Sequence, residues 1–142
     1  MVMEYAPGVP LLRPYINQDN EGFWQGVNRQ ELVFQRCTEC GLLVHRPRPM
    51  CPRCLSTDRE WVRSEGKGVI YSWVNFVYAN AAYPGIKVPY SVVVVEMVEG
   101  VRIIGNLYDV TPDEVKVGMP VEVVFERIAD DLTLPKFKRR IA

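Results

Sequence analysis

The arrangement of cysteines constrains this chain more than any other feature of its sequence. Cys37 and Cys40 form one C-x2-C pair, Cys51 and Cys54 form another, and ten residues separate the two pairs. Each pair fits a tight backbone turn that directs two sulfurs at one ion. Four thiolates match the closed tetrahedral shell of a structural zinc. The spacing therefore predicts a structural metal site in which all four cysteines are ligands.

Other uses of these cysteines fit less well. Iron would accept the same four-sulfur cage, so the choice of metal stays open, with zinc as the expected ion. Disulfides need an oxidising compartment, and the opening residues MVMEYAPGVP lack a secretory pattern, so we expect a cytoplasmic protein. A redox-active role is typical of a single C-x2-C pair, so two such pairs at the spacing of a zinc ribbon argue against it. His45, the single histidine, lies between the pairs, and we interpret it as a polar residue of the ribbon.

Length and charge narrow the possible functions. The 142 residues suffice for one domain or two small ones. No apolar run approaches the roughly 20 residues that a membrane helix needs. Seventeen basic and seventeen acidic residues cancel, whereas nucleic-acid binding favours a strongly basic face. Basic residues cluster only locally, and such local clusters are either solvated surface or a contact for a phosphorylated small ligand or an acidic protein surface. The clustered residues are Arg46, Arg48, Arg53, Lys136, Lys138, Arg139 and Arg140.

Residues 1–30 are expected to form an extended arm and a short helix. Prolines in the first half of this segment oppose helix formation. Apolar spacing then predicts an amphipathic helix over residues 20–29, in which two glycines each cost about 1 kcal/mol relative to alanine. Such a weak helix needs packing to become ordered. Phe23 and Trp24 are therefore core residues or, in the more specific hypothesis, part of an interface with a partner.

Residues 31–64 are expected to form the zinc ribbon. Residues 31–36 (ELVFQR) are predicted as the strand that leads into the first cysteine pair, and residues 42–44 as the strand that leaves it. A unit of this size cannot bury enough apolar surface to fold unaided, so the metal must supply much of its stability. We expect metal removal to unfold it.

Residues 65–142 are expected to form a small barrel. Alternating apolar residues predict five strands, over 69–78, 90–98, 101–108, 121–126 and 133–138. In the first strand, the alternation places Tyr71 and Trp73 on one face and Ile70 and Val74 on the other. Five antiparallel strands favour an OB-type barrel. The predicted fold is thus mainly β, with an N-terminal arm and helix, a rubredoxin-like zinc ribbon and a C-terminal five-stranded OB-type barrel.

The sequence shows none of the familiar catalytic patterns. All cysteines are assigned to the metal, the one histidine lies between them, and there is no nucleophile elbow, P-loop or dinucleotide fingerprint. A closed metal shell also leaves no position for a substrate. We therefore predict no catalytic residue and no catalysis by this chain alone.

The order of these motifs resembles one known family. The Phe23–Trp24 helix is followed by the segments LVFQRCTECG, CPRC, GKGVIYSW, VPYSVVVVEM and KVGMPVEV. This order is similar to the zinc-ribbon plus OB-fold family known as domain of unknown function thirty-five, over nearly the whole chain. The four cysteines match the metal ligands of that family.

The resemblance implies a role that the residues alone do not. Members are accessory subunits of acyl-CoA-processing complexes, whose thiolase or thiolase-like aldolase partners hold the catalytic residues. By resemblance, this chain would stabilise such a partner in a degradation pathway, in a hetero-oligomer of two plus two or four plus four subunits, and help to hold coenzyme A. Candidate contacts for coenzyme A are Tyr83, Pro84, Gly85 and Lys136, for which a surface loop and a solvated lysine are the alternative interpretation.

Two alternative functions stay open at this point. The chain could be a stand-alone acyl-CoA binder without an enzyme partner. It could also be an OB-fold nucleic-acid-binding module whose exposed aromatic residues stack on bases, namely Tyr71, Trp73, Phe76 and Tyr78. The zero net charge argues against this second alternative. A salt titration separates the two, because phosphate-driven binding weakens steeply with salt.

Overall fold

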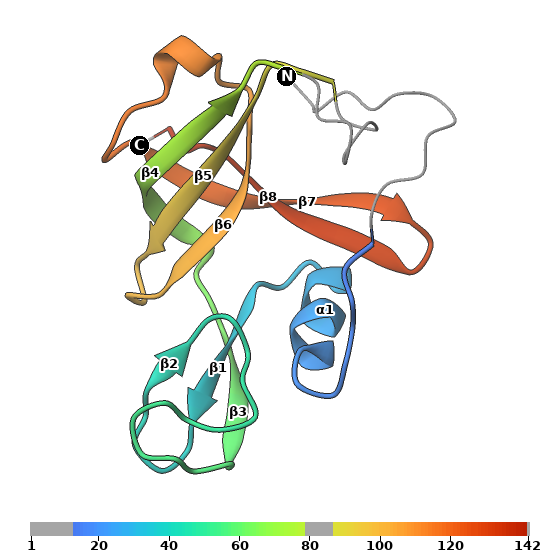
Figure 1. The fold of residues 1–142 in the computed structure, drawn as a ribbon, viewed down its shortest axis with the longest axis vertical. Coiled ribbons are helices and arrows are strands. Elements are labelled where there is room, and N and C mark those ends of the chain that lie inside the picture. Colours follow the sequence, from blue (N-terminus) through green and yellow to red (C-terminus); the bar gives the residue numbers. More distant parts are fainter. Residues whose placement is uncertain (1–12, 79–86, 142) are drawn as a thin grey trace.

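The computed structural model describes residues 13–78 and 87–141. These residues form a short helix, a three-stranded sheet and a closed five-stranded barrel (Figure 1). The predicted mainly β fold, with ribbon and OB-type barrel, is confirmed. In the described part of the chain, no helix is long and apolar enough to cross a membrane. Most of the predicted N-terminal arm lies outside the described residues.

The helix α1 (Glu21–Asn28) packs closely against the ribbon, because two of its residues are glycines without a Cβ atom. A Cβ atom at Gly22 would lie 2.2 Å from Nε1 of Trp61, and one at Gly26 would lie 2.8 Å from Cγ2 of Val33. Neither distance leaves room for a methyl group without movement of a neighbour. The glycines that weaken the isolated helix therefore allow it to approach the sheet.

The ribbon sheet contains β1 (Val33–Cys37), β2 (Leu43–Val44) and β3 (Arg59–Arg63), in the order β2-β1-β3. The first two strands agree with the predicted segments. The third was not predicted, because its sequence REWVR lacks an apolar face and is largely exposed. It forms because all five of its residues pair with β1.

The barrel closes in the order β4-β5-β6-β8-β7. Its strands are β4 (Lys67–Phe76), β5 (Tyr90–Met97), β6 (Arg102–Tyr108), β7 (Pro120–Ala129) and β8 (Leu132–Arg139), with the short 3-10 helix η1 (Pro112–Glu114) between β6 and β7. The prediction that all pairs are antiparallel is wrong at one place, since β6 and β8 run parallel. A closed ring with an odd number of strands cannot alternate direction throughout, so one parallel pair is required.

A β-bulge changes which side chains of β4 face the core. The pairing with β5 shifts between Ile70 and Ser72. As a result Ile70 is 0% exposed and Val74 is 54% exposed, although the simple alternation placed them on one face. Trp73 packs against the core instead. That part of the strand prediction is wrong, because one extra residue reverses the alternation beyond it.

Helix, ribbon and barrel share one hydrophobic core. Buried residues of α1 and β1 join those of the barrel strands in a single cluster. The backbone amide of Ser64 donates to the carbonyl of Leu32 at 2.8 Å, and the amide of Thr133 donates to Oδ1 of Asn28 at 2.9 Å. These contacts hold the three segments against one another. The division at residues 30 and 64 stays a prediction.

Candidate metal centre and adjoining pocket

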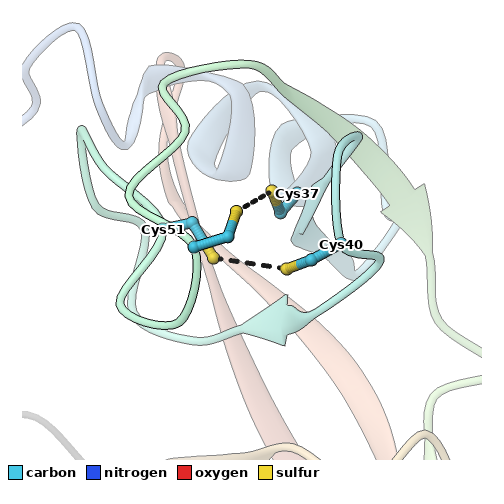
Figure 2. A group of neighbouring side chains, drawn as sticks. Cys37, Cys40 and Cys51 are labelled. Atoms are coloured by element: carbon cyan, nitrogen blue, oxygen red, sulfur yellow. Dashed lines mark hydrogen bonds between the residues drawn. The ribbon is translucent and has the colours of Figure 1, made fainter.

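The four predicted metal ligands converge in the ribbon (Figure 2). Their sulfurs all lie within 4.8 Å of one another, with Cys37 Sγ 3.5 Å from Cys54 Sγ and Cys40 Sγ 3.6 Å from Cys51 Sγ. A disulfide needs about 2.05 Å between sulfurs. Ligands at about 2.3 Å from a tetrahedral zinc lie about 3.8 Å apart. The side chains therefore fit a four-sulfur metal site and not a pair of disulfides.

Two equivalent backbone turns position these cysteines. In each turn the amide of the first cysteine donates to the carbonyl five residues later, and the amide four residues later donates back to the first cysteine, at 2.8 to 3.0 Å. The residue after the second cysteine is left-handed in both turns, with φ of 76° at Gly41 and 66° at Leu55. Glycine adopts this conformation freely, so Leu55 holds it under strain.

Hydrogen bonds and crowding set the charge of the thiols. A hydrogen bond from the backbone amide of Leu42, assisted by one from Arg53, lowers the pKa of Cys40 to about 6. The amide of Ser56 also lowers the pKa of Cys54, but burial and the three other thiols outweigh it and raise the pKa to about 12. Four thiolates this close repel one another. A divalent cation among them would allow all four to ionise.

A pocket lies where α1, the ribbon and the barrel meet. Its volume is about 410 Å³, within the range of small-molecule sites. Phe23 and Trp24 form part of its wall, with ring centroids 5.2 Å apart in an edge-to-face arrangement. Residues of β6 and β8 complete the apolar wall, among them Ile103, Leu134 and Pro135. We call this the aromatic pocket.

Lys136 and His45 are two of the polar residues that line the aromatic pocket. Lys136 is only 3% exposed, burial lowers its pKa, and its Nζ donates to Oδ1 of Asn106 at 2.9 Å. The ring of His45 lies 5.2 Å from that of Phe23, and its Nδ1 is buried without a hydrogen-bond partner among the described residues. Burial, assisted by the charge of Arg46, lowers the pKa of His45 to about 4.

The aromatic pocket brings together residues that were predicted for different roles. Phe23 and Trp24, predicted as interface residues, line it together with Lys136, a candidate contact for coenzyme A. Phe23 is 5% exposed, which makes it a core residue of the chain, and its interface role stays a prediction. The candidates Tyr83, Pro84 and Gly85 lie outside the described residues. Lys136 is not the solvated lysine of the alternative interpretation.

His45 was missed as a pocket residue. The sequence marks it only as a single histidine between two cysteine pairs, whereas its place in the pocket depends on contacts with Phe23 and Phe34. Asn106 was missed for the same reason. Neither residue carries a local pattern that could have indicated its position.

Most of the aromatic residues considered for base stacking are already engaged. The guanidinium carbon of Arg102 lies 3.7 Å from the ring centroid of Tyr71. Phe76 stacks on Tyr90, with centroids 4.9 Å apart and ring planes at 10°. Trp73 packs against the core. These contacts argue against a base-stacking platform on β4.

Family models match both halves of the structure. Residues 24–60 match the rubredoxin-like zinc ribbon domain of ChsH2, and residues 61–126 match the C-terminal OB-fold domain of ChsH2. Among solved structures, a chain of "Ltp2-ChsH2(DUF35) aldolase" is 37% identical with a TM-score of 0.85, covering 91% of this chain and 100% of that one. A DUF35-family protein from Sulfolobus solfataricus, 16% identical over 89% of this chain and 88% of its own, shares the fold with a TM-score of 0.60.

Curated relatives extend this likeness. A probable enoyl-CoA hydratase alpha subunit from Thermomonospora curvata is 39% identical over 95% of this chain and 42% of its own length. The 3-oxo-4,17-pregnadiene-20-carboxyl-CoA hydratase alpha subunit of Mycobacterium tuberculosis is 36% identical over 81% of this chain and 36% of its own length. The chain thus spans less than half of these two relatives.

A third relative has similar length to this chain. The DUF35 domain-containing scaffold protein of Methanocaldococcus jannaschii is 34% identical over 76% of this chain and 77% of its own length. This chain therefore resembles its relatives in sequence as well as in the fold of the ribbon and barrel. The chain belongs to the DUF35 family, with a ChsH2-type zinc ribbon and OB-fold domain.

Proposed function

We propose that this chain is a non-catalytic accessory subunit of a hetero-oligomeric complex that acts on acyl-CoA substrates. The observation that carries the proposal is the likeness to the complete DUF35 chain of an Ltp2-ChsH2 aldolase, at 37% identity and a TM-score of 0.85. The names of the hydratase alpha subunits and of the archaeal scaffold protein support the same role. The partner is a thiolase-like enzyme, a thiolase or a retro-aldolase of a degradation pathway, and it supplies the reacting groups.

We further propose that the four cysteines hold one structural zinc. The convergence of the four sulfurs within 4.8 Å of one another and the match to a rubredoxin-like zinc ribbon support this assignment. Bound zinc would cross-link the two turns of the ribbon and neutralise the thiolates. The ribbon would then present a fixed surface to the partner, while residues 65–142 form the barrel domain that packs against it. We place this subunit in the cytoplasm.

Affinity purification of the tagged chain from its host, with mass spectrometry of the retained proteins, tests the accessory role. We expect a thiolase-family enzyme at near-equal amount, in an assembly of two plus two or four plus four subunits. The matched control is the Cys37→Ser/Cys54→Ser variant, which should lose both zinc and the enzyme. Recovery of the zinc-loaded chain alone would contradict the proposal and favour a stand-alone acyl-CoA binder.

A further inference from the structure

A lysine that is almost completely shielded from water forms part of the wall of the aromatic pocket. Among residues 13–78 and 87–141, Lys136 is the only lysine, arginine, aspartate or glutamate that is buried. Moving an ammonium group out of water costs free energy, and lysines commonly avoid this cost by extending the amine to solvent. Lys136 instead directs its Nζ to the side chain of Asn106 on β6. The fold therefore keeps an amine at the pocket in spite of the cost.

The surroundings of Lys136 favour the neutral amine over the ammonium form. Burial lowers its pKa, and the charge of Glu126 on β7 only partly offsets this effect. Of the described residues that line the pocket, His45 and Arg46 are the other two with basic side chains, and none is a carboxylate. At neutral pH, Lys136 therefore holds an unprotonated amine for a larger share of the time than an exposed lysine does.

A hydrogen bond to Asn106 fixes the direction of this amine. Oδ1 of Asn106 accepts from Nζ of Lys136 at 2.9 Å, and Nδ2 of Asn106 donates to the carbonyl of Ser91 at 3.4 Å. The second bond orients the amide so that its oxygen faces the lysine. A neutral amine that donates a hydrogen bond keeps its lone pair, which is the part of the group that reacts with electrophiles. The amine is thus held in place with its nucleophilic electrons intact.

The aromatic pocket offers space for a small molecule beside this amine. Its volume is about 410 Å³, and most of its lining residues are apolar or aromatic, among them Phe23, Trp24, Ile103 and Pro135. Such walls exclude water, which favours both the neutral amine and the loss of water from an adduct. A carbonyl compound with an apolar body could bury that body against the aromatic rings and bring its carbonyl carbon to Nζ of Lys136.

We infer that Lys136 binds an aldehyde or ketone covalently, as an imine, inside the aromatic pocket. The lone pair of the amine attacks the carbonyl carbon, the π electrons move to the oxygen, and one proton passes from nitrogen to that oxygen. The resulting hydroxyl leaves with the second amine proton as water, and the carbon–nitrogen double bond forms. Hydrolysis reverses both steps, so the capture is reversible and needs neither an oxidant nor a reductant.

The inference rests on the proposed function only for the source of the ligand. Retro-aldol cleavage of a carbon–carbon bond releases an aldehyde or a ketone. A retro-aldolase partner would therefore produce the class of compound that Lys136 binds. The captured compound leaves unchanged after hydrolysis, so the chain remains a binding subunit and performs no net reaction.

Reductive trapping on the full zinc-loaded chain tests the inference. The probe is naphthaldehyde, and sodium cyanoborohydride converts its imines to stable secondary amines that peptide mass spectrometry locates. At pH 7 we expect Lys136 to be labelled at least about ten-fold faster than the exposed Lys67 and Lys116. The difference should shrink as the pH approaches about 10.4, where exposed lysines also lose their proton. Labelling of Lys136 at or below the rate of the exposed lysines would overturn the inference.

A competitor without a carbonyl group locates the reaction. Naphthalenemethanol has the same apolar body as the probe and cannot form an imine. It should slow labelling of Lys136 and leave labelling of Lys116 unchanged, because only the first lies in the pocket. Equal labelling of Lys136 with and without the competitor would show that the aldehyde does not react from the aromatic pocket.

A pair of variants separates the covalent bond from simple burial of the probe. Lys136→Met removes the amine but keeps a side chain of similar length, and Lys116→Met is the matched control at an exposed position. Without reductant, we expect Lys136→Met to bind naphthaldehyde at least about ten-fold more weakly and naphthalenemethanol as the wild type does, measured by probe fluorescence. The control should bind both compounds like the wild type. Wild-type affinity of Lys136→Met for naphthaldehyde would contradict a covalent contribution.

The two proposals fail in different ways. If the wild-type chain retains its enzyme partner but Lys136 is labelled no faster than exposed lysines, the imine inference fails and the accessory role stands. If Lys136 is labelled selectively but the chain retains no enzyme, the accessory role fails and the covalent site stands.

Discussion

Leu55 holds the second cysteine turn in a strained conformation. Its φ is 66°, at the position where the first turn has Gly41, and its side chain is 67% exposed. Leu55→Gly should remove strain of about 1 kcal/mol, part of which is lost to the greater freedom of glycine in the unfolded chain. We expect a gain of about 0.5 kcal/mol in the free energy of unfolding, measured by denaturant titration of the zinc-loaded chain. The reverse change, Gly41→Ala, should lower the free energy of unfolding. If Leu55→Gly lowered it as well, the two turns would not be equivalent.

His45 makes stability depend on pH. Burial lowers its pKa from 6.5 to about 4, so between these values the unfolded chain binds a proton that the folded chain excludes. Stability contributed by this residue is therefore complete above pH 6.5 and falls as the pH drops towards 4. His45→Phe should reduce the loss of unfolding free energy between pH 7.5 and pH 5 by about 1–2 kcal/mol. Thiol protonation acts on both proteins, so the difference between their titrations isolates His45. Identical pH dependence would contradict its burial.

The helix α1 depends on its two glycines for contact with the ribbon. Gly26→Ala would gain about 1 kcal/mol of helix propensity. Its Cβ, however, would lie 2.8 Å from Val33 Cγ2 and 3.0 Å from the Glu31 carbonyl, and overpacking of this kind costs about 1–3 kcal/mol. We expect a net loss in the free energy of unfolding. Gln25→Ala, on the exposed face of the same helix, should change stability little, and stabilisation by Gly26→Ala would show that the close packing is not required.

The ribbon should depend on zinc more than the barrel does. Its three strands are short and lie beside the proposed zinc site, whereas the barrel strands form a closed ring of their own. After chelation, hydrogen exchange should lose protection in β1 to β3 and keep it in β5, β6 and β8. Uniform loss of protection would mean that the shared core makes the chain one cooperative unit.

At the scale of elements, the sequence predicts strands that alternate and misses those that do not. The β5 segment has such a clear apolar run that its bounds could be predicted within one residue. Conversely, β3 is hidden, because charged residues fill it and only its pairing with β1 creates it. The bulge in β4 is hidden too, since one extra residue leaves no local mark. The convergence of the four cysteines was predictable from two short motifs.

The aromatic pocket depends on the packing of the whole molecule and could not be predicted from any single segment. Its walls come from α1 and the segment before it, the segment after β2, and strands β6 and β8, which are far apart in the sequence. Local patterns identified Phe23, Trp24 and Arg46 as features of interest, but only the packing of ribbon on barrel unites them. The same packing joins the proposed zinc site to the aromatic pocket, because the ribbon contains the cysteines and also carries His45 and Arg46.

The central claim, a non-catalytic subunit of an acyl-CoA-acting complex, is tested most directly by turnover of an acyl-CoA substrate. The rate is measured for the purified chain alone, for its thiolase-like partner alone, and for the two together. The account predicts no turnover by the chain alone, and a faster or more durable reaction from the complex than from the partner alone. Turnover by the chain alone would contradict it. A partner whose rate and lifetime are unchanged by the chain would contradict it equally.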